Sequence, residues 1–134
     1  MTTNCRRLSL VLFCVVAIHC TNSVTPIPPD PATVHSIDVY QNDTVIHVID
    51  SAATIEEIVR ILREDVADWA YPDKPLAPAV ALALFRGPSN EILYELRIGS
   101  NWISGDDSTM DRPNPRVGTV DSKHLERLEN RLGV

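Results

Sequence analysis

The alternation of apolar and polar residues predicts a β-hairpin near the start of the folded part of the chain. Residues 33–40 and 44–50 are rich in β-branched side chains, which favour strands. Asn42 and Asp43 lie between these two segments. They suit a two-residue turn, because both residue types tolerate the positive backbone angles that such turns need.

This turn sets the expected register of the hairpin. It pairs Ile37 with Val48 and Val39 with Ile46, which places these aliphatic side chains on the core face. The opposite face then carries side chains that suit partial solvation: Ser36, Asp38, Tyr40, Val45, His47 and Ile49.

Helical periodicity predicts a helix over residues 54–69. Thr54 is a good N-cap, and Glu57 three positions later completes the pattern of a capping box. One apolar stripe recurs at helical spacing: Ile55, Ile58, Val59, Leu62, Val66 and Trp69.

Shorter patterns follow the helix. Residues 79–85 form an apolar run that predicts a strand buried on both faces. Residues 91–98 alternate and predict a second strand with these side chains inward: Ile92, Tyr94, Leu96 and Ile98. Residues 101–103 predict a short fifth strand, and the polar residues 104–119 predict a long loop.

The last predicted element is a helix that begins at Asp121 or Ser122 and ends near Gly133. Its apolar side is formed by Leu125, Leu128 and Leu132. The predicted order is therefore β-β-α-β-β-α. Because local hairpins join the strands, we expect a single α+β domain over residues 33–134, with an antiparallel sheet of four to five strands and two helices on one face.

The N-terminal residues have the pattern of an export signal. Arg6 and Arg7 precede an apolar run over residues 8–18. This run is too short to cross a bilayer, which takes about 20 apolar residues. Cys20 ends the apolar region and is followed by the proline-rich residues 21–31.

This arrangement resembles the leader of a bacterial lipoprotein. The resemblance implies that residues 1–19 are removed as a signal peptide and that Cys20 carries the lipid that anchors the protein to a membrane. Residues 20–32 would then be a proline-rich tether. The alternative is an ordinary secretory leader, cut after Ala17 or Ser23.

The chain is acidic, with a net charge of −6 from 18 acidic and 12 basic residues. Since Arg6 and Arg7 lie in the leader, its removal makes the rest more acidic. No cluster of lysines or arginines is present, so we expect no nucleic-acid partner. Cys5 and Cys14 also lie in the leader, and a lone Cys20 allows no intramolecular disulfide.

Two His-x-x-Asp segments, His35 to Asp38 and His47 to Asp50, stand on the two arms of the hairpin. The expected register places His47 opposite Asp38 and His35 opposite Asp50, on different faces of the sheet. We interpret them as two cross-strand pairs that do not converge on one site. The alternative is a pH-sensitive surface, because a carboxylate neighbour raises the pKa of an imidazole.

An aspartate cluster in the predicted loop, Asp106, Asp107 and Asp111, offers the oxygen ligands that calcium prefers. Its spacing matches no established calcium loop, and Arg112 and Arg116 lie close in sequence. We therefore expect a solvated loop, with no metal and no cofactor. The sequence also has no nucleophile, phosphate-binding or zinc-protease motif, so we do not expect an enzyme.

These features predict an exported, lipid-anchored protein of the cell envelope that acts as a non-catalytic binding or accessory domain. The candidate binding residues are Tyr40, His47 and Trp102, since exposed aromatic residues are enriched where proteins bind. One alternative is a secreted inhibitor or immunity-type protein that binds one basic partner. A lesser alternative is a metal-dependent hydrolase that joins the aspartate loop to His47 or His124.

Overall fold

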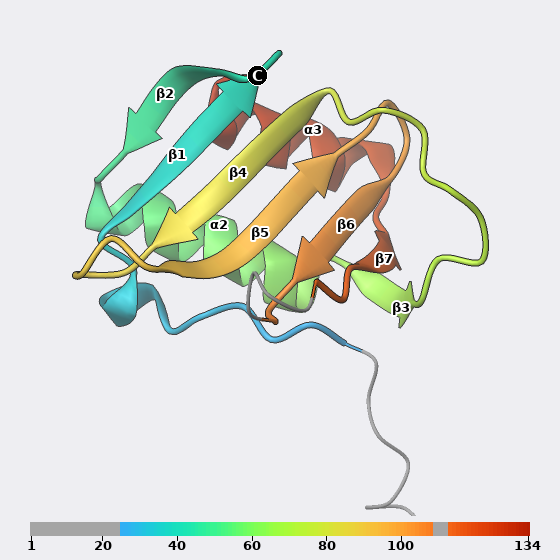
Figure 1. Cartoon of the computed structure of the whole chain (residues 1–134), viewed down its shortest axis with the longest axis horizontal. Helices are drawn as coiled ribbons and strands as arrows, with labels where there is room; N and C mark the ends of the chain where they lie inside the picture. Colours follow the sequence, from blue (N-terminus) through green and yellow to red (C-terminus); the bar gives the residue numbers. More distant parts are fainter. Residues whose placement is uncertain (1–24, 109–112) are drawn as a thin grey trace, which may run out of the picture.

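The computed structural model describes residues 25–108 and 113–134, which form a seven-stranded antiparallel sheet and two α-helices (Figure 1). The strands lie in the order β2-β1-β4-β5-β6-β7-β3. The elements in chain order are η1 (Pro31–Thr33), β1 (Ser36–Gln41), β2 (Thr44–Ile49), α2 (Ala52–Glu64), β3 (Ala67–Ala70), β4 (Ala81–Arg86), β5 (Ile92–Ile98), β6 (Ile103–Asp106), β7 (Arg116–Thr119) and α3 (Ser122–Leu132).

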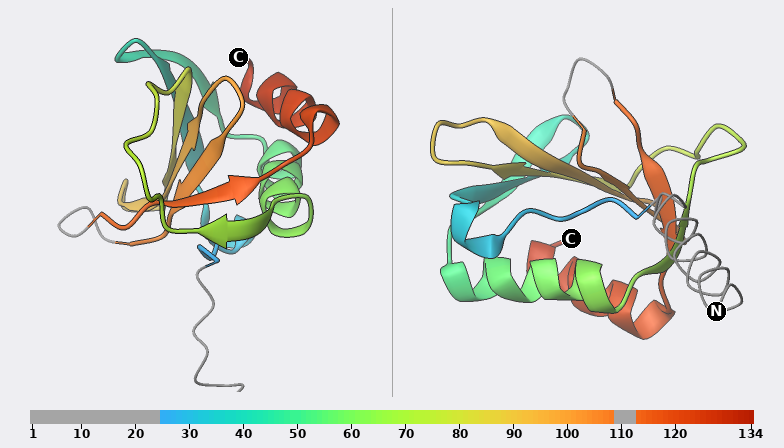
Figure 2. Two further views of the ribbon diagram at one scale, coloured as in Figure 1. Left: turned by 90° about the vertical axis from the view of Figure 1, so that its right-hand side faces the viewer. Right: turned by 90° about the horizontal axis from the view of Figure 1, so that it is seen from below.

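Helices α2 and α3 lie together on one face of the sheet (Figure 2). Figure 1 looks onto the other face, which no helix of the described residues covers. The predicted α+β class and antiparallel sheet are confirmed, but the described sheet has more strands than the expected four to five. The short strands β3, β6 and β7 include Gly, Ser and Asp, which have low strand propensity and gave little signal in the sequence.

The predicted turn of the first hairpin is confirmed, because Asn42 and Asp43 have positive φ angles of 49° and 61°. The predicted register is wrong beyond the turn. A bulge next to Val39 shifts the pairing, so that Val39 lies opposite His47 and Ile37 lies opposite Ile49.

The bulge changes which side chains of β2 face the helices. Ile49 and the extra residue Ile46 pack against the core, while Val48 turns to the other face and is 60% exposed. A one-residue shift moves side chains to the opposite face of a sheet, because strand side chains alternate.

Helix α2 is shorter than predicted and begins earlier. Ser51 is its N-cap and accepts a hydrogen bond from the amide of Thr54 at 3.5 Å, so Thr54 is a helical residue and not the cap. The helix ends at Glu64. Val66 and Trp69 are buried as expected, but they lie beyond the helix, with Trp69 in β3.

The core lies between the sheet and the two helices. The helices contribute apolar side chains that the periodicity predicted, and Ile61 in addition: Ile55, Ile58, Val59, Ile61, Leu62, Leu125, Leu128 and Leu132. From the sheet, the rings of Phe85 and Tyr94 meet edge to face with centroids 5.4 Å apart. Burial alternates along β4, so the prediction that both of its faces are buried is wrong.

The final helix follows its prediction closely. Asp121 is the N-cap of α3 and accepts a hydrogen bond from the amide of His124 at 2.8 Å. Gly133 ends the helix in the left-handed conformation, with φ of 78°.

Part of the predicted tether belongs to the folded body. Pro26 and Pro28 are buried, and Arg63 of α2 donates hydrogen bonds to the carbonyls of Pro28 and Pro29, both at 3.4 Å. The amide of Ile27 donates to Asp107 at 2.7 Å. These contacts hold residues 25–34 along the end of the core (Figure 2). The predicted signal peptide over residues 1–19 and Cys20 lie outside the described residues.

Candidate functional site

The face of the sheet opposite the helices is the candidate site. We call it the open face and limit the name to strands β2, β1, β4 and β5. The registers of these strands align two rows of side chains across it. One row is Val45, Tyr40, Leu82 and Arg97, and the next is Val48, Asp38, Leu84 and Glu95.

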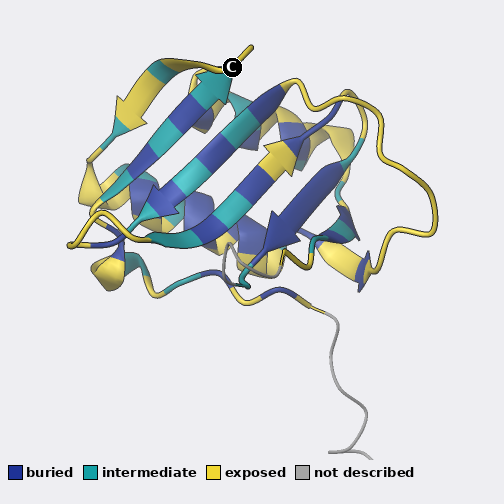
Figure 3. Ribbon diagram, viewed as in Figure 1, coloured by how far each residue is buried: buried dark blue, intermediate teal, exposed yellow. Residues whose placement is uncertain are grey.

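Aliphatic side chains dominate the outer part of the open face. Val45 and Val48 of β2 are 45% and 60% exposed, and Val80, the residue before β4, is 53% exposed. In Figure 3, β2 is largely exposed, whereas β6 on the far side is buried along its length. A shallow hollow of about 260 Å³ lies at one end of this face, between Tyr40, Leu82 and Arg97.

The charged groups in the middle of the open face bind one another. Arg86 donates to Asp38 at 2.6 Å, to the Tyr40 hydroxyl at 3.5 Å and to the carbonyl of Asn90 at 3.3 Å. The hydrogen bond to Asp38 raises the pKa of the Arg86 guanidinium above its ordinary value. Arg97 donates to Glu95 at 2.6 Å. These pairs leave the centre of the face nearly neutral.

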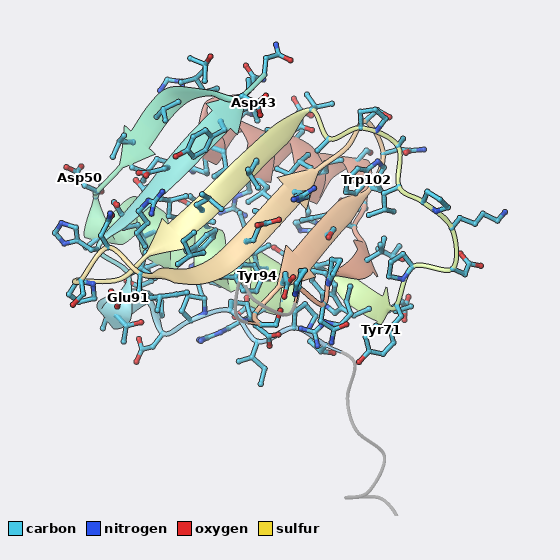
Figure 4. All side chains as sticks on the ribbon, viewed as in Figure 1. Asp43, Asp50, Tyr71, Glu91, Tyr94 and Trp102 are labelled. Carbon is cyan, nitrogen blue, oxygen red and sulfur yellow. The ribbon has the colours of Figure 1, made fainter. Side chains whose placement is uncertain are left out.

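The margin of the open face is acidic. Asp43 stands at the β1–β2 turn, Asp50 at the end of β2 and Glu91 at the β4–β5 turn (Figure 4). Asp43 and Asp50 make no ion pair with any residue of the described ranges. The face therefore combines exposed aliphatic side chains on β2, paired charges at its centre, and aspartates without a described ion pair at its border.

The three candidate binding residues do not form one surface. Tyr40 lies on the open face. His47 lies on the other face, where its ring stands over Gly133 at the end of α3. Trp102 lies against Gly99 and borders a separate groove of about 370 Å³ beside Tyr71. Figure 4 shows Trp102 and Tyr71 on the side of the molecule away from Asp43 and Asp50.

The predicted His–Asp pairs of the hairpin are wrong. Asp38 binds Arg86, and the bulge places His47 opposite Val39. An unforeseen pair occurs on α3 instead, where His124 Nδ1 lies 2.6 Å from Asp121. The backbone hydrogen bond from His124 lowers the pKa of Asp121, as expected for a helix N-cap carboxylate. This pair therefore caps the N-terminus of α3.

The described part of the aspartate loop is bound internally. Burial alone would raise the pKa of Asp106, but hydrogen bonds from Ser108 and from the amide of Asn114 outweigh it and lower that pKa. Arg116 forms an ion pair with Asp107. Asp111 lies outside the described residues. Within residues 25–108 and 113–134, no group of three or more His, Cys, Asp or Glu side chains could hold a metal ion.

The residues that sequence reasoning missed are Leu82, Leu84 and Arg86 of β4. Their outward positions follow from the alternation of β4, but the uniformly apolar run concealed it. No helix among the described residues is long and apolar enough to cross a membrane. Comparisons with protein-family models, curated proteins and solved structures found no match to this chain.

Proposed function

We propose that this chain is a non-catalytic binding protein that holds a basic protein partner on its open face. The observation that supports this proposal is the combination described above: exposed Val45 and Val48 beside an acidic margin, on the face that α2 and α3 leave uncovered. Burial of exposed aliphatic surface supplies affinity, and complementary charge at the border supplies orientation and a fast association rate.

The shape of the face favours a protein over a small ligand. Its hollow is shallow, and the polar groups that line its centre are already engaged with one another. Small-molecule sites are typically enclosed pockets with convergent, available polar groups. Exposed aliphatic side chains among polar and charged residues, without a deep pocket, are instead typical of a protein interface.

The cellular location is part of the proposal. The basic start, the apolar run and Cys20 favour export and attachment to the cell envelope through a lipid on Cys20. The measurement is the intact mass of the membrane-fraction protein beside that of the Cys20→Ser variant. We expect the unchanged protein to begin at Cys20 and to carry acyl groups. The variant should show neither this cleavage nor the acyl groups. A soluble chain that begins after Ala17 or Ser23 in both proteins would contradict the anchor.

The acidic margin also favours a second candidate, an inhibitor or immunity-type protein that blocks one basic target. This candidate requires a single cognate partner whose activity stops when it is bound. Its association rate should fall steeply as salt rises, because screening removes long-range attraction between opposite charges. An accessory protein with the same surface would leave its partner active.

The binding proposal is tested by placing a positive charge on the open face. Val48→Arg and Val45→Arg should keep the fold, since Val48 is 60% exposed and Val45 45% exposed. The matched control is Ile27→Arg, because Ile27 is 72% exposed and lies away from this face. Each protein is crosslinked in the cells that make it, and captured chains are quantified by mass spectrometry. We expect a basic partner that Ile27→Arg retains and both valine variants lose. Equal capture by all variants would overturn the proposal.

A further inference from the structure

The two edges of the sheet differ in how they are protected. Strand β3 forms one edge with four residues, and its pairing with β7 is broken by a register shift at Asp68, which has a positive φ of 52°. Pro72 follows shortly after β3, and proline cannot donate to a neighbouring strand. Short length, irregular backbone and proline are the usual means by which proteins prevent an edge from pairing.

Strand β2 forms the other edge. Its pairing with β1 contains the bulge at Ile46, but the strand lacks the short length and the nearby proline that protect β3. It is six residues long, contains no charge, glycine or proline, and is β-branched at every position except His47. Among the described residues its backbone pairs only with β1. Figure 1 shows no described segment beside its outer edge. An exposed apolar edge strand of this length is a template for an added strand.

Charge at the ends of β2 disfavours the full-length antiparallel pairing of β2 with β2 of a second copy. One antiparallel register places Val45 of one chain opposite Val48 of a second copy. The same register places Asp43 of each chain opposite Asp50 of the other. Like charges directly opposite destabilise a strand pair. The net charge of −6 on each chain adds to the repulsion.

We propose that the outer edge of β2 binds an extended segment of the basic partner by strand addition. The segment carries β-branched side chains in its middle, against Val45 and Val48, and a lysine or arginine at each end, against Asp43 and Asp50. Backbone hydrogen bonds supply affinity, and the two end charges supply orientation. This inference rests on the proposed function, because it specifies how the partner of the open face also engages the adjacent edge.

The test uses the full chain and two synthetic peptides. One is Lys-Thr-Val-Thr-Thr-Val-Thr-Lys, and the other replaces both lysines with glutamate. We expect the chain to bind the lysine-ended peptide about tenfold more tightly, because Asp43 and Asp50 attract the two lysines and repel the two glutamates. On binding, deuterium uptake should slow over residues 44–49 and stay unchanged over β3 at the other edge.

The double variant Asp43→Asn with Asp50→Asn removes the end charges and keeps the turn, since asparagine tolerates the positive φ of position 43. Its preference for the lysine-ended peptide should fall below about twofold. The control Asp73→Asn changes an exposed aspartate of the β3–β4 connection and should keep the full preference. Equal binding of both peptides by the unchanged protein, or slowed exchange outside β2, would overturn the inference.

Two further measurements separate this inference from the proposed function and from self-association. If the peptide preference is absent but partner capture is still lost with Val45→Arg and Val48→Arg, the edge inference fails and open-face binding stands. If capture is also unaffected, both fail. Sedimentation should show a monomer at neutral pH. A dimer that Val48→Arg dissociates would make a second copy the occupant and overturn the assignment of a basic partner.

Discussion

The same strands present two different surfaces to the two sides of the sheet. Toward the helices, β1, β4 and β5 place side chains that are at most 2% exposed: Ile37, Val39, Ala83, Phe85, Tyr94, Leu96 and Ile98. Toward the open face, the intervening positions carry Asp38, Tyr40, Leu82, Leu84, Glu95 and Arg97. One side of each strand thus contributes to the hydrophobic core, while the described helices leave the other side uncovered.

The two faces differ in whether their tyrosine hydroxyl groups have described hydrogen-bond partners. On the open face, the Tyr40 hydroxyl accepts from Arg86, which also binds Asp38. On the covered face, the Tyr94 hydroxyl is buried and has no hydrogen-bond partner among the described residues. Burial raises the pKa of Tyr94 above its ordinary value, so it stays neutral. The polar groups at the centre of the open face are thus paired, whereas the Tyr94 hydroxyl in the core has no described partner.

The largest expected effect is the loss of stability when the same leucine-to-alanine truncation is made on the two faces of the sheet. Leu96→Ala removes a fully buried side chain of β5 and should lower the free energy of unfolding by about 2–5 kcal/mol. Leu84→Ala makes the same change on neighbouring β4, but its half-buried side chain should cost about 1 kcal/mol. Urea unfolding at neutral pH measures both. Equal losses would mean that the open face is covered in solution.

Sequence could predict the parts of this fold that depend on neighbouring residues. The Asn42-Asp43 turn, the helical stripe from Ile55 to Leu62, and the last helix from its Asp121 cap to Gly133 all follow from local chemistry. Their geometry needs little information from distant segments, so a single sequence is sufficient to indicate them.

The parts that failed depend on distant partners. The bulge at Val39 lies in a strand that also pairs with the distant β4, and it removed both predicted His–Asp pairs. Trp69 continued a helical spacing but is held in a strand by β7. Glu57 was expected to complete a cap, yet it turns to two arginines of α3. Of the candidate site, Tyr40 was foreseen, whereas Arg86 was not, because its partner Asp38 lies 48 positions away.

A second prediction concerns the border between the covered face and edge strand β2. Gly133→Ala forces a side chain into the left-handed conformation and against the ring of His47. We expect a loss of about 1 kcal/mol or more in the free energy of unfolding. The double variant Gly133→Ala with His47→Ala should recover part of the lost stability, because it removes the steric contact between the two side chains. If His47→Ala gives no recovery, the cost is purely one of backbone conformation.

The two tyrosines sharpen the comparison of polar groups. Tyr94→Phe removes a buried hydroxyl without a described partner and should raise the free energy of unfolding by up to about 1 kcal/mol. Tyr40→Phe removes a weak contact with Arg86 at 3.5 Å and should leave stability nearly unchanged. Thermal unfolding of the unchanged protein and of the two variants ranks their stabilities. A Tyr94→Phe variant that is less stable would show that its hydroxyl is hydrogen-bonded in solution.

The smallest effect at neutral pH is expected at the outer surface of the helical layer. Glu57 of α2 accepts from Arg127 at 2.8 Å and lies 2.9 Å from Arg131, both on α3. The hydrogen bond from Arg127 and the nearby positive charges lower the pKa of Glu57 below its ordinary value. Solvent screening keeps the contribution of such exposed pairs small.

This contribution has a characteristic dependence on pH. Because the pKa of Glu57 is lower in the folded state, the unfolded chain takes up the proton first on acidification. The stabilisation is therefore complete above the unfolded value of about 4.3 and is lost as pH falls through the folded value. The difference in unfolding free energy between the unchanged protein and Glu57→Gln should be constant near neutral pH and shrink below about pH 4.3. Glu126→Gln, on an exposed part of α3 without an ion pair to any described residue, should show no such change. A Glu57 difference that persists to pH 2 would mean that the bridge between α2 and α3 depends on the shape of the side chain and not on its charge.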